Sequence, residues 1–223
     1  MIETCYKYLE DFQTFGYQRR GLFNSEILLI YCMAREMNIR LIIESGIARG
    51  HSTYTLAKNL IDTETEIIAI DKDKISDDIK FFCKRLDNDE DDLKIGIWYK
   101  DFYKFVKHNI NMFDDIDTLV IIDGPKGRDA IFLAEKLLKR SNIKGCFIHD
   151  LYSPNPDRDL LEYIFTNTFY TDDPQYVEAF QHLDHDCWEL LKGTDSPAKD
   201  PYHRRGKKIN SYASTLAFIP KQQ

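Results

Sequence analysis

Between residues 41 and 150 the sequence repeats one pattern, in which a short apolar run ends in an acid or a glycine and is followed by a stretch with helical spacing. This alternation is typical of βαβ units. Each run is continuously apolar, as expected for parallel strands that are covered by helices on both faces. The pattern predicts strands at residues 41–46, 66–71, 94–101, 118–124 and 145–150.

Helices are predicted between these strands and on either side of them. Apolar residues recur at helical spacing along residues 128–140 and form one stripe that can be buried. Asn24 or Ser25 is placed to cap a helix that precedes the first strand. The predicted helices cover residues 2–15, 25–37, 52–60, 76–86, 102–110, 128–140, 159–170 and 174–183.

Two more strand candidates, residues 187–192 and 212–220, are separated by a polar stretch that we interpret as a surface loop. The 223 residues are enough for one core, so the chain is predicted to be a single α/β domain with a Rossmann-like three-layer sandwich. Its predicted parts are a helical cap or lid at 1–40, cofactor-binding βα units at 41–150, and C-terminal helices with a strand pair at 151–223.

The composition argues against several kinds of partner. A net charge of −7 disfavours binding to a phosphate backbone, so no nucleic-acid partner is expected. The 5 cysteines are odd in number and far apart, which fits neither a disulfide framework nor a zinc site. The first residues include acids where a signal peptide has basic residues, and no apolar run is long enough to cross a bilayer. We therefore expect a cytoplasmic monomer or homodimer with no membrane partner.

A glycine-containing turn follows the first predicted strand. The strand ends at Glu44, Gly46 and Gly50 follow four residues apart, and a helix begins at Ser52. Glycine allows tight turning and close approach to a ligand, and a helix N-terminus offers free N–H groups to a carboxylate or phosphate. Asp71 ends the second strand, at the usual offset for a carboxylate that binds a ribose diol. The pattern favours a nucleoside ligand.

These residues resemble the first motif of class I S-adenosylmethionine (SAM)-dependent methyltransferases, and Asp71 resembles their second-strand acid. Ala48 stands in the middle of the motif, as in the branch of small-molecule and sugar O-methyltransferases. The resemblance implies a mostly parallel seven-stranded sheet with an antiparallel C-terminal strand. It also implies a set of cofactor-binding residues: Gly46, Ala48, Gly50, His51 and Ser52 for the methionine part, Asp71 for the ribose, Asp101 with Phe102 for the adenine, and Glu44, Ser45, Lys72 and Asp123 beside them.

The fourth and fifth predicted strands end in a second group of polar residues. Asp123 ends the fourth strand, and His149 and Asp150 end the fifth. In metal-dependent O-methyltransferases of the catechol type, acids at these two strand ends hold magnesium. The resemblance therefore implies that Asp123 and Asp150 could bind Mg2+ or Mn2+, whereas His149 departs from that pattern.

Two mechanisms are open for activating an acceptor's hydroxyl. A divalent cation on Asp123 and Asp150 would acidify and orient the hydroxyl. Alternatively, His149 would act as general base, because its unperturbed pKa lies near neutrality. Lys126, three residues after Asp123, could steady the substrate's oxygens. The catalytic candidates are thus His149, Asp123 and Lys126.

The favoured hypothesis is SAM-dependent O-methylation of a hydroxyl on a sugar, a glycan or another small molecule. A nicotinamide-dependent oxidoreductase or epimerase is the main alternative, but it normally needs a G-x-G-x-x-G turn that Gly46 to Gly50 does not provide. A non-catalytic nucleotide-binding module is the third alternative, since fold does not fix function.

Overall fold

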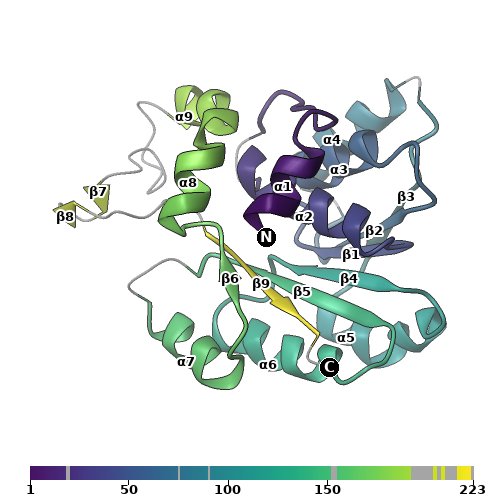
Figure 1. Cartoon of the computed structure of the whole chain (residues 1–223). Helices are drawn as coiled ribbons and strands as arrows, with labels where there is room; N and C mark the ends of the chain where they lie inside the picture. Colours follow the sequence, from purple (N-terminus) through teal and green to yellow (C-terminus); the bar gives the residue numbers. More distant parts are fainter. Residues whose placement is uncertain are drawn as a thin grey trace.

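A seven-stranded sheet runs through the middle of the protein in the computed structural model, in the order β3-β2-β1-β4-β5-β9-β6 (Figure 1). The structure describes residues 1–18, 21–74, 76–89, 91–151, 155–191, 203–204, 207–208 and 215–221. β1 to β5 are mutually parallel, and only β9 runs antiparallel, between β5 and β6. The strands are β1 (Leu41–Ser45), β2 (Glu66–Asp71), β3 (Ile95–Tyr99), β4 (Thr118–Ile122), β5 (Ile143–His149), β6 (Phe169–Tyr170) and β9 (Leu216–Pro220).

Helices cover both faces of the sheet and give the predicted three layers (Figure 1). One face carries α1 (Ile2–Tyr8), α2 (Asn24–Glu36), α3 (His51–Asn59) and α8 (Pro174–Phe180). The other face carries α5 (Phe102–His108), α6 (Arg128–Leu138) and α7 (Pro156–Ile164). The remaining elements are α4 (Asp77–Asp87), η1 (Ile110–Phe113), η2 (Gln181–Asp184), α9 (His185–Leu191), and the paired strands β7 (His203–Arg204) and β8 (Lys207–Lys208).

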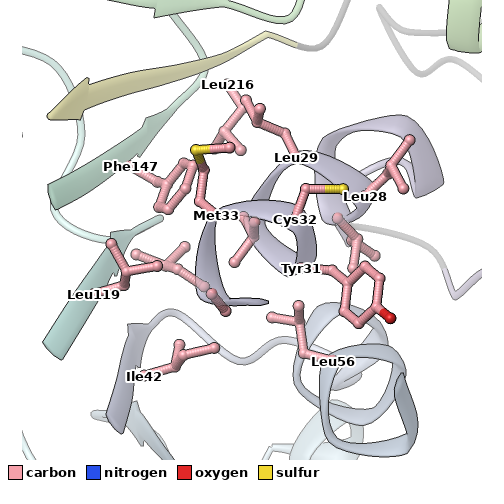
Figure 2. Packing of buried hydrophobic residues seen from close by; sticks show 14 of the residues in the cluster. Leu28, Leu29, Tyr31, Cys32, Met33, Ile42, Leu56, Leu119, Phe147 and Leu216 are labelled. Atoms are coloured by element: carbon pink, nitrogen blue, oxygen red, sulfur yellow. The ribbon is translucent and has the colours of Figure 1, made fainter. Parts of the chain in front are cut away.

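Neighbouring residues of the central strands are buried on opposite faces. Ile42 of β1 packs in the core beneath α2, whereas Leu41 and Ile43 pack on the side of α5 and α6. In Figure 2, Met33 of α2 faces Phe147 of β5, with Ile42 and Leu119 on the strands alongside. β1 and β4 are buried along their whole length because helices cover both of their faces, whereas the edge strand β3 is only partly buried.

The start of α2 differs from the predicted cap. The helix begins at Asn24 with Phe23 as its N-cap residue, and Glu26 Oε2 accepts a hydrogen bond of 2.7 Å from the Phe23 N–H. Asn24 and Ser25 are the first helical residues, and their side chains bond Leu183 and Asp184 instead. The acid three residues on therefore provides the cap, and the two residues expected to cap are used in tertiary contacts.

Of the two strands predicted near the C-terminus, the second is present as β9 and the first is wrong. Residues 187–192 were expected to be a strand, but α9 (His185–Leu191) covers most of them, and Cys187 packs with Phe23 and Tyr17. β9 pairs with β6, which lies within the predicted helix 159–170. That helix ends at Ile164, where Phe165 turns to extended backbone. Short apolar runs do not distinguish a strand from a buried helix by spacing alone.

Other predicted elements differ mainly in length. The helix expected at residues 2–15 ends at Tyr8, and the helices expected at 102–110 and 174–183 each end in a 3-10 turn. Much of the predicted loop between residues 193 and 211 lies outside the described residues. Within the part of the chain that the structure describes, no helix is both long and apolar enough to cross a membrane.

Candidate active site

The carboxyl ends of the four central strands are level with one another. Ser45 at the end of β1 pairs with Ile70 of β2 on one side and Ile122 of β4 on the other, and Ile122 pairs with Ile148 of β5. The polar residues that come next, Gly46, Asp71, Asp123 and His149, are therefore brought to one edge of the sheet. Ligands of open α/β sheets bind beyond this edge.

A cavity of 270 Å³ opens at this edge, beside the ends of β1, β2 and β4. Six of the predicted cofactor residues line it: Ser45, Gly46, Asp71, Lys72, Asp101 and Phe102. The other lining residues are Ile70, Lys100, Tyr103, Gly124 and Pro125. Lys100, Tyr103 and Pro125 were not singled out from the sequence, although each adjoins a residue or motif that was.

The turn after β1 has a backbone that favours glycine. Gly46 has φ +87° and Gly50 has φ +69°, both in the left-handed region. A Cβ on Gly46 would lie 3.2 Å from the backbone of Asp123, and one on Gly50 would lie 2.0 Å from the ring of Phe82. Ala48 also has positive φ, at +48°. The turn therefore brings bare backbone against the end of β4 and positions the start of α3.

Asp71 lines the cavity and also holds the turn. Its Oδ2 accepts a hydrogen bond of 3.1 Å from the Ile47 N–H, and its Oδ1 accepts one of 3.0 Å from the Asp73 N–H. The side chain is half-buried. Two fixed donors orient the carboxylate, so any diol that it binds would meet a preset acceptor.

Glu44 and Ser52 lie beneath the turn and do not line the cavity. Glu44 is fully buried and accepts hydrogen bonds from the Ser52 and Thr53 hydroxyls. Burial raises the pKa of Glu44 to about 7, and the charge of Asp123 adds to the rise. The cofactor contacts predicted for Glu44 and Ser52 remain untested, and their position indicates a supporting role.

His51 is also enclosed. It is 1% exposed, its Nε2 lies 3.0 Å from Asn24 Oδ1, and its ring packs edge-on against Tyr17. Burial lowers the pKa of His51 to about 3, so the ring is neutral at physiological pH. Its side chain is not among those lining the cavity.

A charged cluster adjoins the cavity at the ends of β4 and β5. His149 Nδ1 lies 2.5 Å from Asp123 Oδ1, and Lys126 Nζ forms ion pairs with Asp123 and, at 2.7 Å, with Asp150 Oδ2. Asp150 has φ +67°, which is uncommon for a residue other than glycine. The structure thus brings together all four residues that the sequence assigned to catalysis or to a metal.

His149 is held between two carboxylates. Its Nε2 lies 3.5 Å from Glu26 Oε2, on the side opposite Asp123. Burial alone would lower the pKa of His149, but the charges of Asp123 and Glu26 outweigh it and hold the pKa well above its usual value. The ring therefore carries its proton at neutral pH. A protonated imidazole cannot accept a proton, so the raised pKa argues against the general-base role of His149, which stays a prediction.

Glu26 is a site residue that the sequence interpretation missed. It lies far from the strand ends in sequence and reaches them only because α2 packs across the sheet. The available signal was its place in the sequence, an acid three residues after the residue that precedes a helix, which is typical of a capping box.

Asp123, His149 and Asp150 could in principle hold a cation, because one donor atom from each lies within 4.8 Å of the others. In the present arrangement, however, the Lys126 ammonium is paired with both carboxylates, and both ring nitrogens of His149 face carboxylates. A divalent cation bound by both acids would compete with Lys126 for them. The cluster as it stands already contains the positive charge that such an ion would supply.

No protein-family model and no curated protein matches the sequence. Three solved structures have a similar fold. They are the O-methyltransferase TomG from Streptomyces achromogenes, involved in tomaymycin synthesis and in complex with SAM (12% identity, 99% of this chain and 90% of that chain, TM-score 0.54), cofactor-bound Rv0187 from MTB (7%, 92% and 84%, TM-score 0.55), and a candidate O-methyltransferase from Klebsiella pneumoniae (14%, 98% and 87%, TM-score 0.52).

At these identities the likeness concerns the fold. In this chain the fold is a mostly parallel seven-stranded sheet in which one strand, β9, runs antiparallel. The fold class predicted from the sequence is confirmed. The chain has a Rossmann-like fold, which it shares with these methyltransferase structures.

Proposed function

We propose that this chain is a SAM-dependent O-methyltransferase. The observation that carries the proposal is a single juxtaposition: a cavity lined by the glycine turn, Asp71 and the start of α5 lies directly beside the Asp123–Lys126–Asp150 cluster. The first part suits an amino-acid-bearing nucleoside, and the second suits a hydroxyl that must lose its proton.

The residues around the cavity fit SAM. Gly46 leaves room where a side chain would crowd Asp123, so the methionine part of the cofactor would lie along this turn and beside the N-terminus of α3. Asp71 would accept hydrogen bonds from the ribose diol. Phe102 and the half-exposed Tyr103 would flank the adenine.

When bound, SAM supplies an electrophilic methyl group, which the acceptor oxygen takes up as the carbon–sulfur bond breaks and the bond's electron pair stays on sulfur. The Lys126 ammonium, whose side chain is 48% exposed, would hold and polarise the acceptor oxygen. The hydroxyl proton would pass to Asp150, whose carboxylate is half exposed and lies beside Lys126. Asp123, bonded to both Lys126 and His149, would keep the cluster aligned. Catalysis would come mainly from positioning and fixed charge.

For the acceptor we propose a hydroxyl-rich small molecule, such as a sugar or a glycan end. The groups beside the cavity that can meet an acceptor are charged: Lys126, Asp150 and the 70%-exposed Arg128, which pairs with Asp157. Such a rim offers hydrogen bonds to several hydroxyls at once. We propose cation-independent transfer as the main mechanism because Lys126 already pairs with both acids; assistance by Mg2+ or Mn2+ is the alternative.

Calorimetric titration tests the proposed function. S-adenosylhomocysteine (SAH) should bind and NAD should not, and neither a chelator nor added Mg2+ should change the SAH affinity. Transfer of labelled methyl from SAM to a panel of sugars, nucleotide sugars and phenols then tests the chemistry. Binding of NAD without SAH would reject the proposal in favour of an oxidoreductase. Transfer that chelation abolishes and Mg2+ restores would support the cation-assisted alternative.

A further inference from the structure

The first turn of α2 contacts three separate parts of the molecule. Asn24 bonds His51 in the glycine motif, Ser25 donates to Asp184 of η2, and Glu26 faces His149 at the end of β5. All three residues of the turn are buried. Buried polar side chains need partners, so these contacts anchor the start of α2, and only the one made by Glu26 reaches the charged cluster.

Glu26 makes two different contacts from this turn. It is 1% exposed, and its Oε2 accepts 2.7 Å from the Phe23 N–H as a helix cap. The same oxygen lies 3.5 Å from His149 Nε2. Capping requires only an acceptor, which a glutamine would also provide. A buried carboxylate that keeps its charge is stabilised by a positive partner, and His149 is placed to be that partner.

His149 links Glu26 to the Asp123–Lys126–Asp150 cluster. Its ring is fixed at both nitrogens, with Nδ1 2.5 Å from Asp123 Oδ1. Lys126 pairs with this same oxygen of Asp123. The position of Asp123, and through it that of Lys126, therefore depends on how His149 is held.

We propose that Glu26 is a positioning residue of the transfer site, which acts through His149 to keep Asp123 and Lys126 in place. The role rests on the proposed methyltransferase function, since it is the transfer step that the aligned cluster serves. Glu26 does not touch the cavity. Its loss should slow transfer without weakening cofactor binding.

The variant Glu26→Gln isolates this role because the amide oxygen can still cap α2 while the charge is lost. We expect kcat for the best acceptor of the panel to fall about tenfold or more, the size of effect expected from a lost charge-assisted hydrogen bond. The affinity for SAH should stay unchanged. Ser25→Ala is the matched control from the same turn: it removes the hydroxyl bond to Asp184, keeps the backbone N–H bond, and should lower the melting temperature but leave kcat unchanged.

A double-mutant cycle distinguishes positioning from a general structural effect. If Glu26 acts through His149, the variant carrying both Glu26→Gln and His149→Gln should be no slower than His149→Gln alone. Losses that multiply in the double variant, or full activity of Glu26→Gln, would overturn the proposal.

A nuclear magnetic resonance measurement on ¹⁵N-histidine-labelled protein gives a test that needs no acceptor. His149, assigned with the His149→Gln variant, should show two slowly exchanging ring N–H signals in the wild type, and Glu26→Gln should lose the Nε2–H signal. Retention of both signals in Glu26→Gln would overturn the positioning role. Failure of the wild type to bind SAH would instead reject the proposed function, while this test of Glu26 would still apply.

Discussion

Gly50 illustrates how one residue sets the shape of the candidate cofactor site. Its φ of +69° lies in the left-handed region, and a Cβ there would come within 2.0 Å of the Phe82 ring. Gly50→Ala should therefore destabilise the protein by about 2 kcal/mol or more, through backbone strain and a steric clash. Urea denaturation measures the loss.

Gly96→Ala is the matched control for Gly50. A Cβ on Gly96 would meet only Trp98 Nε1, at 3.8 Å, which is an ordinary contact. The free energy of unfolding of Gly96→Ala should stay within about 1 kcal/mol of that of the wild type. Equal losses in the two variants would contradict the assigned geometry of the turn.

Asp71 gives the residue-scale test of cofactor recognition. Asp71→Asn replaces the carboxylate that would accept hydrogen bonds from a ribose diol with a neutral amide, so the affinity for SAH should fall about tenfold or more. Asp73→Asn, two residues on and outside the cavity lining, should bind SAH like the wild type. Calorimetry measures both, and equal affinity for Asp71→Asn and the wild type would refute the ribose assignment.

At the residue scale, the sequence located the strand-end groups better than it defined their roles. Asp71, Asp123 and Asp150 could be placed at one edge because parallel strands end together. The sequence could not show that Glu44 lies beneath the turn or that Glu26 reaches His149. Those facts depend on the packing of α2 and α3, which leaves no local pattern.

The contact between α2 and η2 makes stability depend on pH. Burial raises the pKa of Asp184 to about 7, hydrogen bonds from Ser25 oppose the rise, and the charge of Glu26 adds to it. The pKa of an aspartate in the unfolded chain is about 4. The folded state therefore favours protonated Asp184, and the stability that the proton contributes is lost as the pH rises from about 4 through about 7.

Asp184→Asn should remove this dependence because asparagine stays neutral. Between pH 5 and 7 the free energy of unfolding of the wild type should fall by roughly 2 kcal/mol more than that of the variant. Comparing the two proteins cancels the titration of Glu44 and His51, which both share. Parallel pH profiles from urea denaturation would show that Asp184 is not buried against Ser25 as described.

At the element scale, the sequence predicted β1 to β5 and the helices between them, and the structure contains these elements. They were predictable because continuous apolar runs mark the strands and helical spacing of apolar residues marks the helices. The prediction failed at the C-terminal edge. β6 has only two residues, too short to show a pattern, and α9 has apolar residues that suit a strand equally well. Which segment pairs with β9 is decided by tertiary contacts.

Across the whole molecule, helices cover the two faces of the sheet (Figure 1). The parallel strands end level with one another, so Asp71, Asp123 and His149 lie at one edge. That division explains why the sequence predicted the fold and brought the candidate site residues to one edge but did not define their chemistry. Fold follows from the apolar pattern of many residues, whereas the chemistry depends on a few side chains whose partners are distant in sequence.

A crystal structure of the chain with SAH tests the central claim most directly. We expect adenosine beside Asp71 and Phe102, the homocysteine part along Gly46, and the sulfur turned toward Lys126 and Asp150. A ligand bound at any other place, or with its sulfur turned away from that cluster, would contradict it.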